Sequence, residues 1–223
     1  MASSTEENYL KALFNLMNAD GEMALSDLGR ELEVSKPTVN SMMKNLSAKG
    51  RVDHQKYKPI KLTAKGKKYA AMIVRKHRLT EMFLVEKMGF GWEEVHDVAE
   101  QIEHIQSERF FSRMDEILGF PSVDPHGSPI PDENGKIPKV NHIQLSACAA
   151  GSKVRFAALQ HSPRELLDFL NSKELRLGLH LEILNVVEFD GSVEVRYHGH
   201  KSELLSMKVA ESIMVQEILK NHP

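Results

Sequence analysis

The sequence predicts a mostly α protein with α+β parts, built from three successive sections. Apolar residues recur at helical spacing through most of the first 118 positions. Between residues 119 and 142 the chain becomes rich in proline and glycine, which is typical of a domain boundary. Beyond residue 150 the apolar residues fall in short runs that predict β-strands. With 223 residues, the chain is long enough for more than one hydrophobic core.

Three helices are predicted at the start of the chain. Residues 6–19 carry an apolar stripe, and Thr5 is the expected N-cap. Residues 25–32 predict a short helix capped by Ser26, and a third helix begins after a cap at Ser35. Two short helices joined by a tight turn, the second opening with small polar residues, predict a helix-turn-helix.

The segment after these helices predicts a β-hairpin, or wing. Residues 51–63 alternate in character around central turn residues, so the first 63 residues together predict a winged helix-turn-helix. Residues 36–78 hold 13 basic residues and one acid, Asp53. Neutralisation of phosphates by Lys and Arg is the main source of nonspecific DNA affinity, so this charge favours DNA binding. The alternative is an all-α core with a solvated lysine face.

Successive parts of the chain carry opposite charges, although the net charge is only −2. Residues 1–80 contain 15 basic residues (Lys or Arg) against 8 acidic ones (Asp or Glu). Residues 81–120 contain 3 basic residues against 10 acidic ones. A basic part followed by an acidic part with histidines indicates two different charged ligands.

Histidine and carboxylate side chains share helical faces in and beside the acidic part. His77 and Glu81 stand one turn apart on a helix predicted to end near residue 87. The next predicted helix, residues 92–104, places four donors on one face: His96, Glu100, Glu103 and His104. Such acids repel one another unless a cation neutralises them. Oxygen and imidazole donors favour Mn²⁺ or Fe²⁺, with Zn²⁺, Co²⁺ and Ni²⁺ able to compete in vitro.

Other interpretations of these donors stay open on the residues alone. They could form a solvated surface, a zinc hydrolase site or a di-iron carboxylate bundle, although the bundle needs two Glu-x-x-His pairs and only Glu93–His96 fits. The sequence has no His-Glu-x-x-His, Gly-x-Ser-x-Gly or P-loop motif, so no enzyme is predicted. One cysteine, Cys148, excludes an intramolecular disulfide and a thiolate-rich zinc cluster.

We expect four segments with distinct roles. Residues 1–73 form the winged helix-turn-helix DNA-binding domain, 74–122 a helical metal-binding and dimerisation domain, 123–150 a Pro- and Gly-rich linker, and 151–223 a small SH3-like β-barrel. The chain has no apolar run near the ~20 residues of a membrane span. It also has no signal-peptide core at its start, so a cytoplasmic protein without a membrane partner is expected.

Several spaced motifs match a known family. In chain order they are Ser35-Lys36-Pro37-Thr38-Val39, Leu62-Thr63-x-x-Gly66, Arg75-Lys76-His77-Arg78-Leu79, Val95-His96-Asp97, Glu103-His104 and the hinge Leu118-Gly119-Phe120-Pro121-x-x-x-Pro125-His126-Gly127. Over essentially its whole length, the chain resembles the diphtheria-toxin-repressor family of metal-dependent transcriptional repressors in its long, three-domain form. The iron-responsive branch has a cysteine where this chain has Glu100, so the resemblance is closest to the manganese-responsive branch.

The resemblance implies two metal sites. The primary site is Glu100, Glu103 and His104, and the ancillary site is His77, Glu81 and His96, completed by Glu165 of the barrel. Asn8 stands where the family has a Met or Asp ligand, and it can offer only a neutral carbonyl oxygen.

Two further positions depart from the family. Lys11 replaces an acid of some manganese regulators, which argues against a tightly bridged dinuclear pair. Asp124 replaces a ligating cysteine of some long relatives and is, with His126, a further candidate donor.

The resemblance also implies a homodimer that binds a palindromic DNA operator when loaded with metal, represses metal-uptake genes and has no small-molecule substrate. At the start of the recognition helix, the residues expected to approach base edges or phosphates are Ser35, Pro37, Thr38, Asn40 and Ser41. The expected contacts to the DNA backbone are Lys36, Lys44, Lys56 and Lys58. The alternatives are a metal-independent winged-helix regulator with a structural acidic stripe and a metallohydrolase fused to a DNA-binding domain.

Overall fold

The computed structural model describes residues 3–18, 20–55 and 58–218 of the chain. The chain divides into two compact units that alternate along the sequence. The first unit comprises residues 1–80, 98–121 and 130–138, and the second comprises residues 81–97, 122–129 and 139–223.

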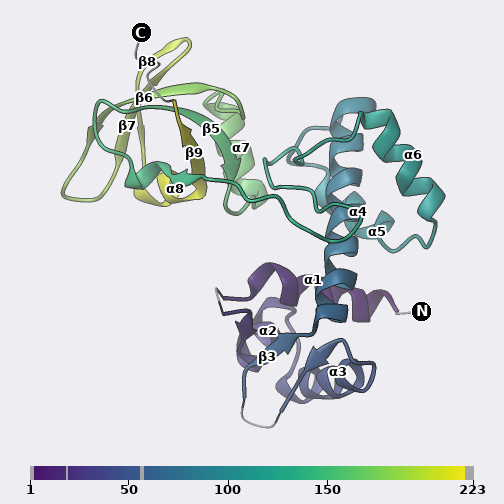
Figure 1. Ribbon diagram of the computed structural model, residues 1–223. Helices are drawn as coiled ribbons and strands as arrows, with labels where there is room; N and C mark the ends of the chain where they lie inside the picture. Colours follow the sequence, from purple (N-terminus) through teal and green to yellow (C-terminus); the bar gives the residue numbers. More distant parts are fainter. Residues whose placement is uncertain (1–2, 19, 56–57, 219–223) are drawn as a thin grey trace. The chain divides into compact units, whose positions relative to one another are not determined.

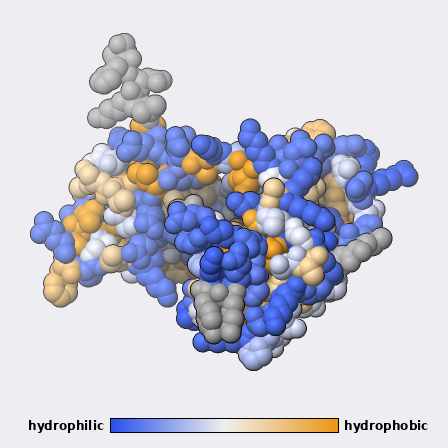
Figure 2. All heavy atoms as spheres, turned by 60° about the horizontal axis from the view of Figure 1, so that its bottom comes forward, coloured by the Kyte–Doolittle hydropathy of each residue, from blue (hydrophilic) through white to orange (hydrophobic). Residues whose placement is uncertain are grey.

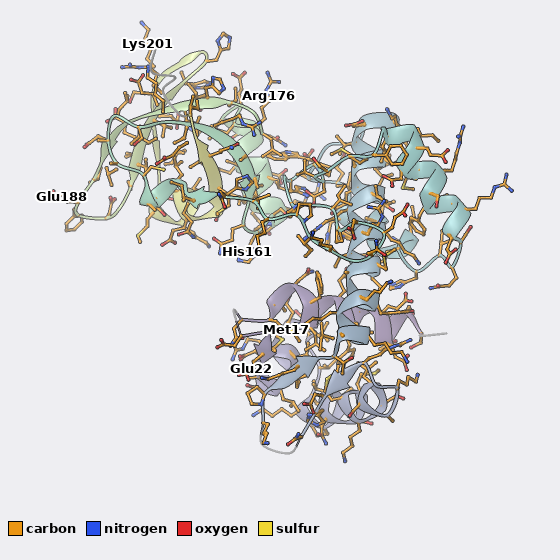
Figure 3. The ribbon with its side chains drawn as sticks, in the orientation of Figure 1. Met17, Glu22, His161, Arg176, Glu188 and Lys201 are labelled. Carbon is orange, nitrogen blue, oxygen red and sulfur yellow. The ribbon has the colours of Figure 1, made fainter. Side chains whose placement is uncertain are left out.

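The N-terminal part of the first unit is a winged helix-turn-helix, as predicted (Figure 1). Its elements are α1 (Ser4–Leu16), β1 (Glu22–Met23), α2 (Leu25–Glu31), α3 (Lys36–Ala48), β2 (Val52–Asp53) and β3 (Ile60–Leu62). The three strands form one antiparallel sheet in the order β1-β3-β2. Glu22, labelled in Figure 3, lies opposite Lys61 in this sheet, and its carboxylate is 2.7 Å from the Lys61 Nζ.

Local signals explain where these helices begin, with two corrections. Ser35 caps α3, since its hydroxyl accepts from the amide of Thr38 and Pro37 stands in the first turn. The predicted cap of α1 at Thr5 is wrong, because the extended backbone of Ser3 places that hydroxyl 3.3 Å from the amide of Glu6. The predicted cap at Ser26 is also wrong: α2 starts at Leu25, so Ser26 is already inside the helix.

The apolar stripes of these helices meet in one core. Leu10 and Leu13 of α1, Leu28 of α2 and Met43 and Leu46 of α3 are completely buried there. Burial of each such side chain contributes about 1.5–3 kcal/mol, so this core fixes α1 against α3.

Three helices continue the chain: α4 (Ala64–Met88), α5 (His96–Ile102) and α6 (Glu108–Leu118). The helix predicted over residues 92–104 is shorter at both ends, so Glu103 and His104 follow α5 in a turn and do not lie on its face. A bond from the Glu103 amide to the Ala99 carbonyl, 2.9 Å, continues the helical path for one residue. Within the first unit, Arg75 of α4 pairs with the buried Asp115 of α6.

The second unit contains the predicted small β domain. Its antiparallel sheet has the order β4-β9-β5-β6-β7-β8 among the described residues. Its strands are β4 (Ile143–Gln144), β5 (Lys153–Leu159), β6 (His180–Val186), β7 (Val193–Tyr197), β8 (His200–Leu205) and β9 (Ile213–Glu217), and its helices are the 3-10 helix η1 (Leu145–Ala147), α7 (Arg164–Ser172) and α8 (Met207–Ser212). Phe156, Ile183 and Val195 are fully buried in its core. Sequence periodicity missed α8, a helix of six residues.

Hydrophilic residues cover most of the face drawn in Figure 2, and hydrophobic residues appear on it as separate patches. Phe110 and Ile117 of α6 are among the exposed apolar side chains, while Phe111 and Met114 of the same helix are buried. Within the described part of the chain, no helix is long and apolar enough to cross a membrane.

We expect Gly66→Ala to destabilise the first unit. A Cβ at Gly66 would lie 1.8 Å from the Arg51 carbonyl oxygen, so α4 must move away from the wing. Overpacking of this kind costs roughly 1–3 kcal/mol of unfolding free energy, measurable by urea denaturation. Lys65→Ala, at an exposed position in the same turn, is the control. Equal midpoints for Gly66→Ala and wild type would contradict the close approach.

Candidate metal centre and DNA-binding surface

The most buried carboxylate of the first unit is Glu103, whose side chain is 0% exposed. Its Oε2 lies 2.9 Å from Lys11 Nζ of α1 and 2.6 Å from His77 Nδ1 of α4. Glu100 of α5 joins the group, because its Oε1 lies 2.5 Å from the same Lys11 Nζ. The candidate ligand atoms of His77, Glu100 and Glu103 all lie within 4.8 Å of one another. Three helices thus bring their polar side chains to one point.

Lys11 supplies a fixed positive charge in this group. Its side chain is 11% exposed, and its ammonium contacts the carboxylates of Glu100 and Glu103. An ammonium between two acids relieves their mutual repulsion, as a divalent cation would. A metal ion held by Glu100 and Glu103 would compete with the Lys11 ammonium for their oxygens.

His104 is a further neighbour of the Glu103 carboxylate. Its Nδ1 lies 2.7 Å from Glu7 Oε2, and its Nε2 lies 3.8 Å from Glu103 Oε1. An ionised carboxylate only accepts hydrogen bonds, so Nδ1 donates to Glu7, and Nε2 is the ring nitrogen on the Glu103 side. This is the arrangement in which a histidine binds a metal while an acid behind it holds the ring. Glu7 is not among the predicted site residues, because its only signal in the sequence is a second acid in the first turn of an amphipathic helix.

Asn8 carries an unsatisfied acceptor. Its Oδ1 is buried and accepts no hydrogen bond from any residue that the structure describes. A buried acceptor without a partner costs about 1–3 kcal/mol, and a cation would satisfy it. The oxygen and imidazole donors of the first unit therefore fit a hard or intermediate divalent ion.

A second group of donors lies in the second unit. The ligand atoms of Glu81, Asp124 and His126 lie within 4.8 Å of one another, and all three residues are buried. The amides of His126 and Ser128 donate to Asp124 Oδ1 at 2.8 and 2.9 Å, which holds the loop closed. His126 Nε2 lies 2.9 Å from the Trp92 carbonyl oxygen, and His126 Nδ1 lies 3.9 Å from Glu81 Oε2.

The remaining predicted ligands are placed differently. His96 Nδ1 lies 3.6 Å from Glu81 Oε1, although its side chain is 65% exposed. His77 stands one helical turn before Glu81 on α4, and its Nδ1 lies 2.6 Å from Glu103 Oε2. Glu165 is exposed in the first turn of α7 and belongs to none of the donor groups found among the described residues.

The predicted DNA-contacting residues lie on α3 and the wing. Those exposed on α3 and at its cap are Ser35, Lys36, Pro37, Thr38, Ser41 and Lys44. Asn40 is half-buried, and its Oδ1 lies 3.0 Å from His54 Nε2. Lys58 is exposed before β3, while Lys56 lies outside the described residues.

Three family models together cover most of the chain. Residues 1–60 match the N-terminal DNA-binding domain of iron dependent repressors, residues 63–132 their metal-binding and dimerisation domain, and residues 143–217 the FeoA domain. A solved structure described as a manganese-dependent transcriptional repressor in complex with manganese is 33% identical, covers 95% of this chain and 99% of its own, and has a TM-score of 0.87. The chain belongs to the diphtheria-toxin-repressor family of metal-dependent transcriptional repressors.

Other relatives agree with this assignment. The iron-dependent repressor IdeR of Mycobacterium tuberculosis is 28% identical over 96% of this chain and 97% of its own length. The diphtheria toxin repressor of Corynebacterium diphtheriae is also 28% identical, with the same coverage. The structure of ScaR with bound Cd²⁺ is 30% identical, covers 96% of this chain and 99% of its own, and has a TM-score of 0.81. The family consists of repressors, not enzymes, so the metallohydrolase alternative is set aside.

We expect Lys11→Met to destabilise the metal-free protein. It removes the ammonium but leaves the buried Glu103 charged, which costs roughly 3 kcal/mol. The melting temperature without metal should fall, and saturating Mn²⁺ should raise it by more than in wild type, because the ion meets no competing ammonium. Lys68→Met, at an exposed position of α4, is the control. A wild-type melting temperature for metal-free Lys11→Met would contradict this account of the group.

Proposed function

We propose that this protein is a repressor activated by Mn²⁺ or Fe²⁺, which binds a palindromic operator as a homodimer and controls metal-uptake genes. The observation that carries the proposal is the group around Glu103. It joins α1, which packs in the core of the DNA-binding domain, to the turn after α5. A cation bound there acts on both at once.

The primary site would be formed by Asn8, Glu100, Glu103 and His104, with His77 beside Glu103. When bound, the metal ion would neutralise the carboxylates and link α1 to α5. Carboxylate, amide and imidazole donors without thiolate support Mn²⁺ or Fe²⁺ as the activating ion, with Zn²⁺, Co²⁺ and Ni²⁺ as competitors in vitro.

The ancillary donors would be Glu81, His96, Asp124 and His126. The burial of the carboxylates of Glu81 and Asp124 beside His126 supports a second ion there. Glu165, which the family resemblance assigns to this site, is exposed on α7 and would have to move to join it.

The DNA contacts would come from the exposed side of α3 and from the wing. Small polar side chains at the start of α3 would approach base edges, and lysines on α3 and the wing would contact phosphates. The exposed Phe110 and Ile117 of α6 support the homodimer, because an apolar helix face is stabilised by covering it with a second copy.

Metal dependence of DNA binding tests the proposal. We expect wild-type protein with Mn²⁺ to bind a duplex selected from random inverted repeats at least tenfold more tightly than protein with chelator, in an anisotropy titration at fixed salt. Glu103→Gln should lose the difference, because it removes the central charge of the site. Equal affinity of wild type with Mn²⁺ and with chelator would instead support the metal-independent regulator.

Two substitutions should separate positioning from base recognition. Lys58→Ala removes a phosphate contact, so it should weaken binding to all duplexes alike and reduce the salt dependence of the affinity. Ser41→Ala should change which sequences are selected from the random pool while leaving the salt dependence unchanged. Uniform weakening by Ser41→Ala would rule out base recognition at that position.

A further inference from the structure

Two consecutive buried acids begin α1, and together they make more polar contacts than a helix start requires. Glu6 and Glu7 have side chains that are 6% and 2% exposed. Acids are favoured in the first turn of a helix, but such acids are ordinarily solvated. Buried carboxylates persist only where partners compensate their desolvation, so the partners of these two acids show what they do.

Glu7 holds the candidate metal ligand His104. Besides the bond to His104 Nδ1, it accepts a hydrogen bond of 2.7 Å from the hydroxyl of Tyr69 on α4 and one of 3.1 Å from Gln106 Nε2. One carboxylate therefore fixes both the ring that faces Glu103 and a tyrosine of the long helix.

Tyr69 connects Glu7 to Arg51. The guanidinium carbon of Arg51 lies 4.2 Å from the centre of the Tyr69 ring, which is the geometry of a cation–π contact. Arg51 stands between α3 and β2, at the base of the wing, and Thr63 Oγ1 donates to its carbonyl oxygen at 3.1 Å.

Glu6 completes the connection at the end of the recognition helix. Its Oε1 accepts from Asn45 Nδ2 at 2.6 Å and from Lys49 Nζ, and its Oε2 lies 3.5 Å from Arg51 Nη1. The pKa of the Glu6 carboxyl lies below its usual value, and the largest cause is the hydrogen bond from Lys49. Asn45 and Lys49 belong to the last turn and C-cap of α3.

We propose that His104, Glu7, Tyr69, Arg51 and Glu6 form a relay that transmits metal binding to the C-terminal end of α3. The proposal rests on the proposed function and names the positioning residues of its switch. His104 would hold the metal through its ring, and coordination would make the imidazole a better donor in the Nδ1 hydrogen bond to Glu7. The fixed Glu7 then orders Tyr69, and Tyr69 and Glu6 together hold Arg51 and the end of α3.

The relay predicts a separation between metal affinity and metal response. Tyr69 contacts Glu7 and Arg51, whereas Glu7 itself contacts the candidate ligand His104. Tyr69→Phe should therefore leave Mn²⁺ affinity within about twofold of wild type and reduce the ratio of DNA affinities with and without Mn²⁺ by roughly 3- to 10-fold. Glu7→Gln should weaken Mn²⁺ binding itself by about 10- to 100-fold.

Tyr9→Phe is the matched control. Tyr9 lies on α1 in the same core, and its buried hydroxyl has no hydrogen-bond partner in the part of the chain that the structure describes. Both variants remove a tyrosine hydroxyl. The hydroxyl of Tyr69 donates to Glu7, whereas that of Tyr9 has no hydrogen-bond partner among the described residues. Tyr9→Phe should keep the wild-type ratio of DNA affinities.

The experiment measures Mn²⁺ affinity by calorimetry and DNA affinity by anisotropy, with saturating Mn²⁺ and with chelator, on full-length protein. A reduced ratio in Tyr69→Phe and an unchanged ratio in Tyr9→Phe support the relay. An unchanged ratio in Tyr69→Phe overturns it; if both DNA affinities fall by the same factor, the ratio is unchanged and the hydroxyl is purely structural. If wild type shows no metal response at all, the proposed function fails, which is a distinct result.

Discussion

The structure of the first unit depends on one buried negative charge, the carboxylate of Glu103. A buried carboxylate is tolerated only with partners that repay its desolvation. Those partners come from different parts of the chain: Lys11 from α1 and His77 from α4. Because the charge needs both, the helix that belongs to the DNA-binding core is attached to the helical part through the same atoms that are candidate metal ligands.

Much of this architecture could be predicted from local sequence signals. The start of α3 depends on a cap at Ser35 and a proline in the first turn, which are short-range effects, and the structure confirms them. The spacing of the candidate donors Glu100 and Glu103 predicted that they lie close together, although Glu103 comes after the end of α5 and is placed by a turn. The spacing predicted that this helix extends to residue 104, but α5 ends at Ile102, because helix ends depend on packing as well as on the sequence pattern.

The parts that could not be predicted involve contacts between residues far apart in the sequence. Glu7 and His104 are 97 positions apart, and no periodicity relates them. The pairing of His77 with Glu103 across 26 positions is of the same kind. The association of Glu81 with Asp124 and His126 depends on a loop in which Gly127 has φ +84° and packs so closely that a Cβ would lie 2.3 Å from the Ala157 carbonyl oxygen.

The ammonium of Lys11 separates folding from occupancy by metal. In small zinc domains the ion supplies the folding energy, so the protein without metal is unfolded and short-lived. Here the Lys11 ammonium contacts the carboxylates of Glu100 and Glu103, so the buried Glu103 has a cationic partner that belongs to the chain itself. The folded first unit thus already holds a partner for its most buried acid, unlike a zinc domain whose ligands have none without the ion.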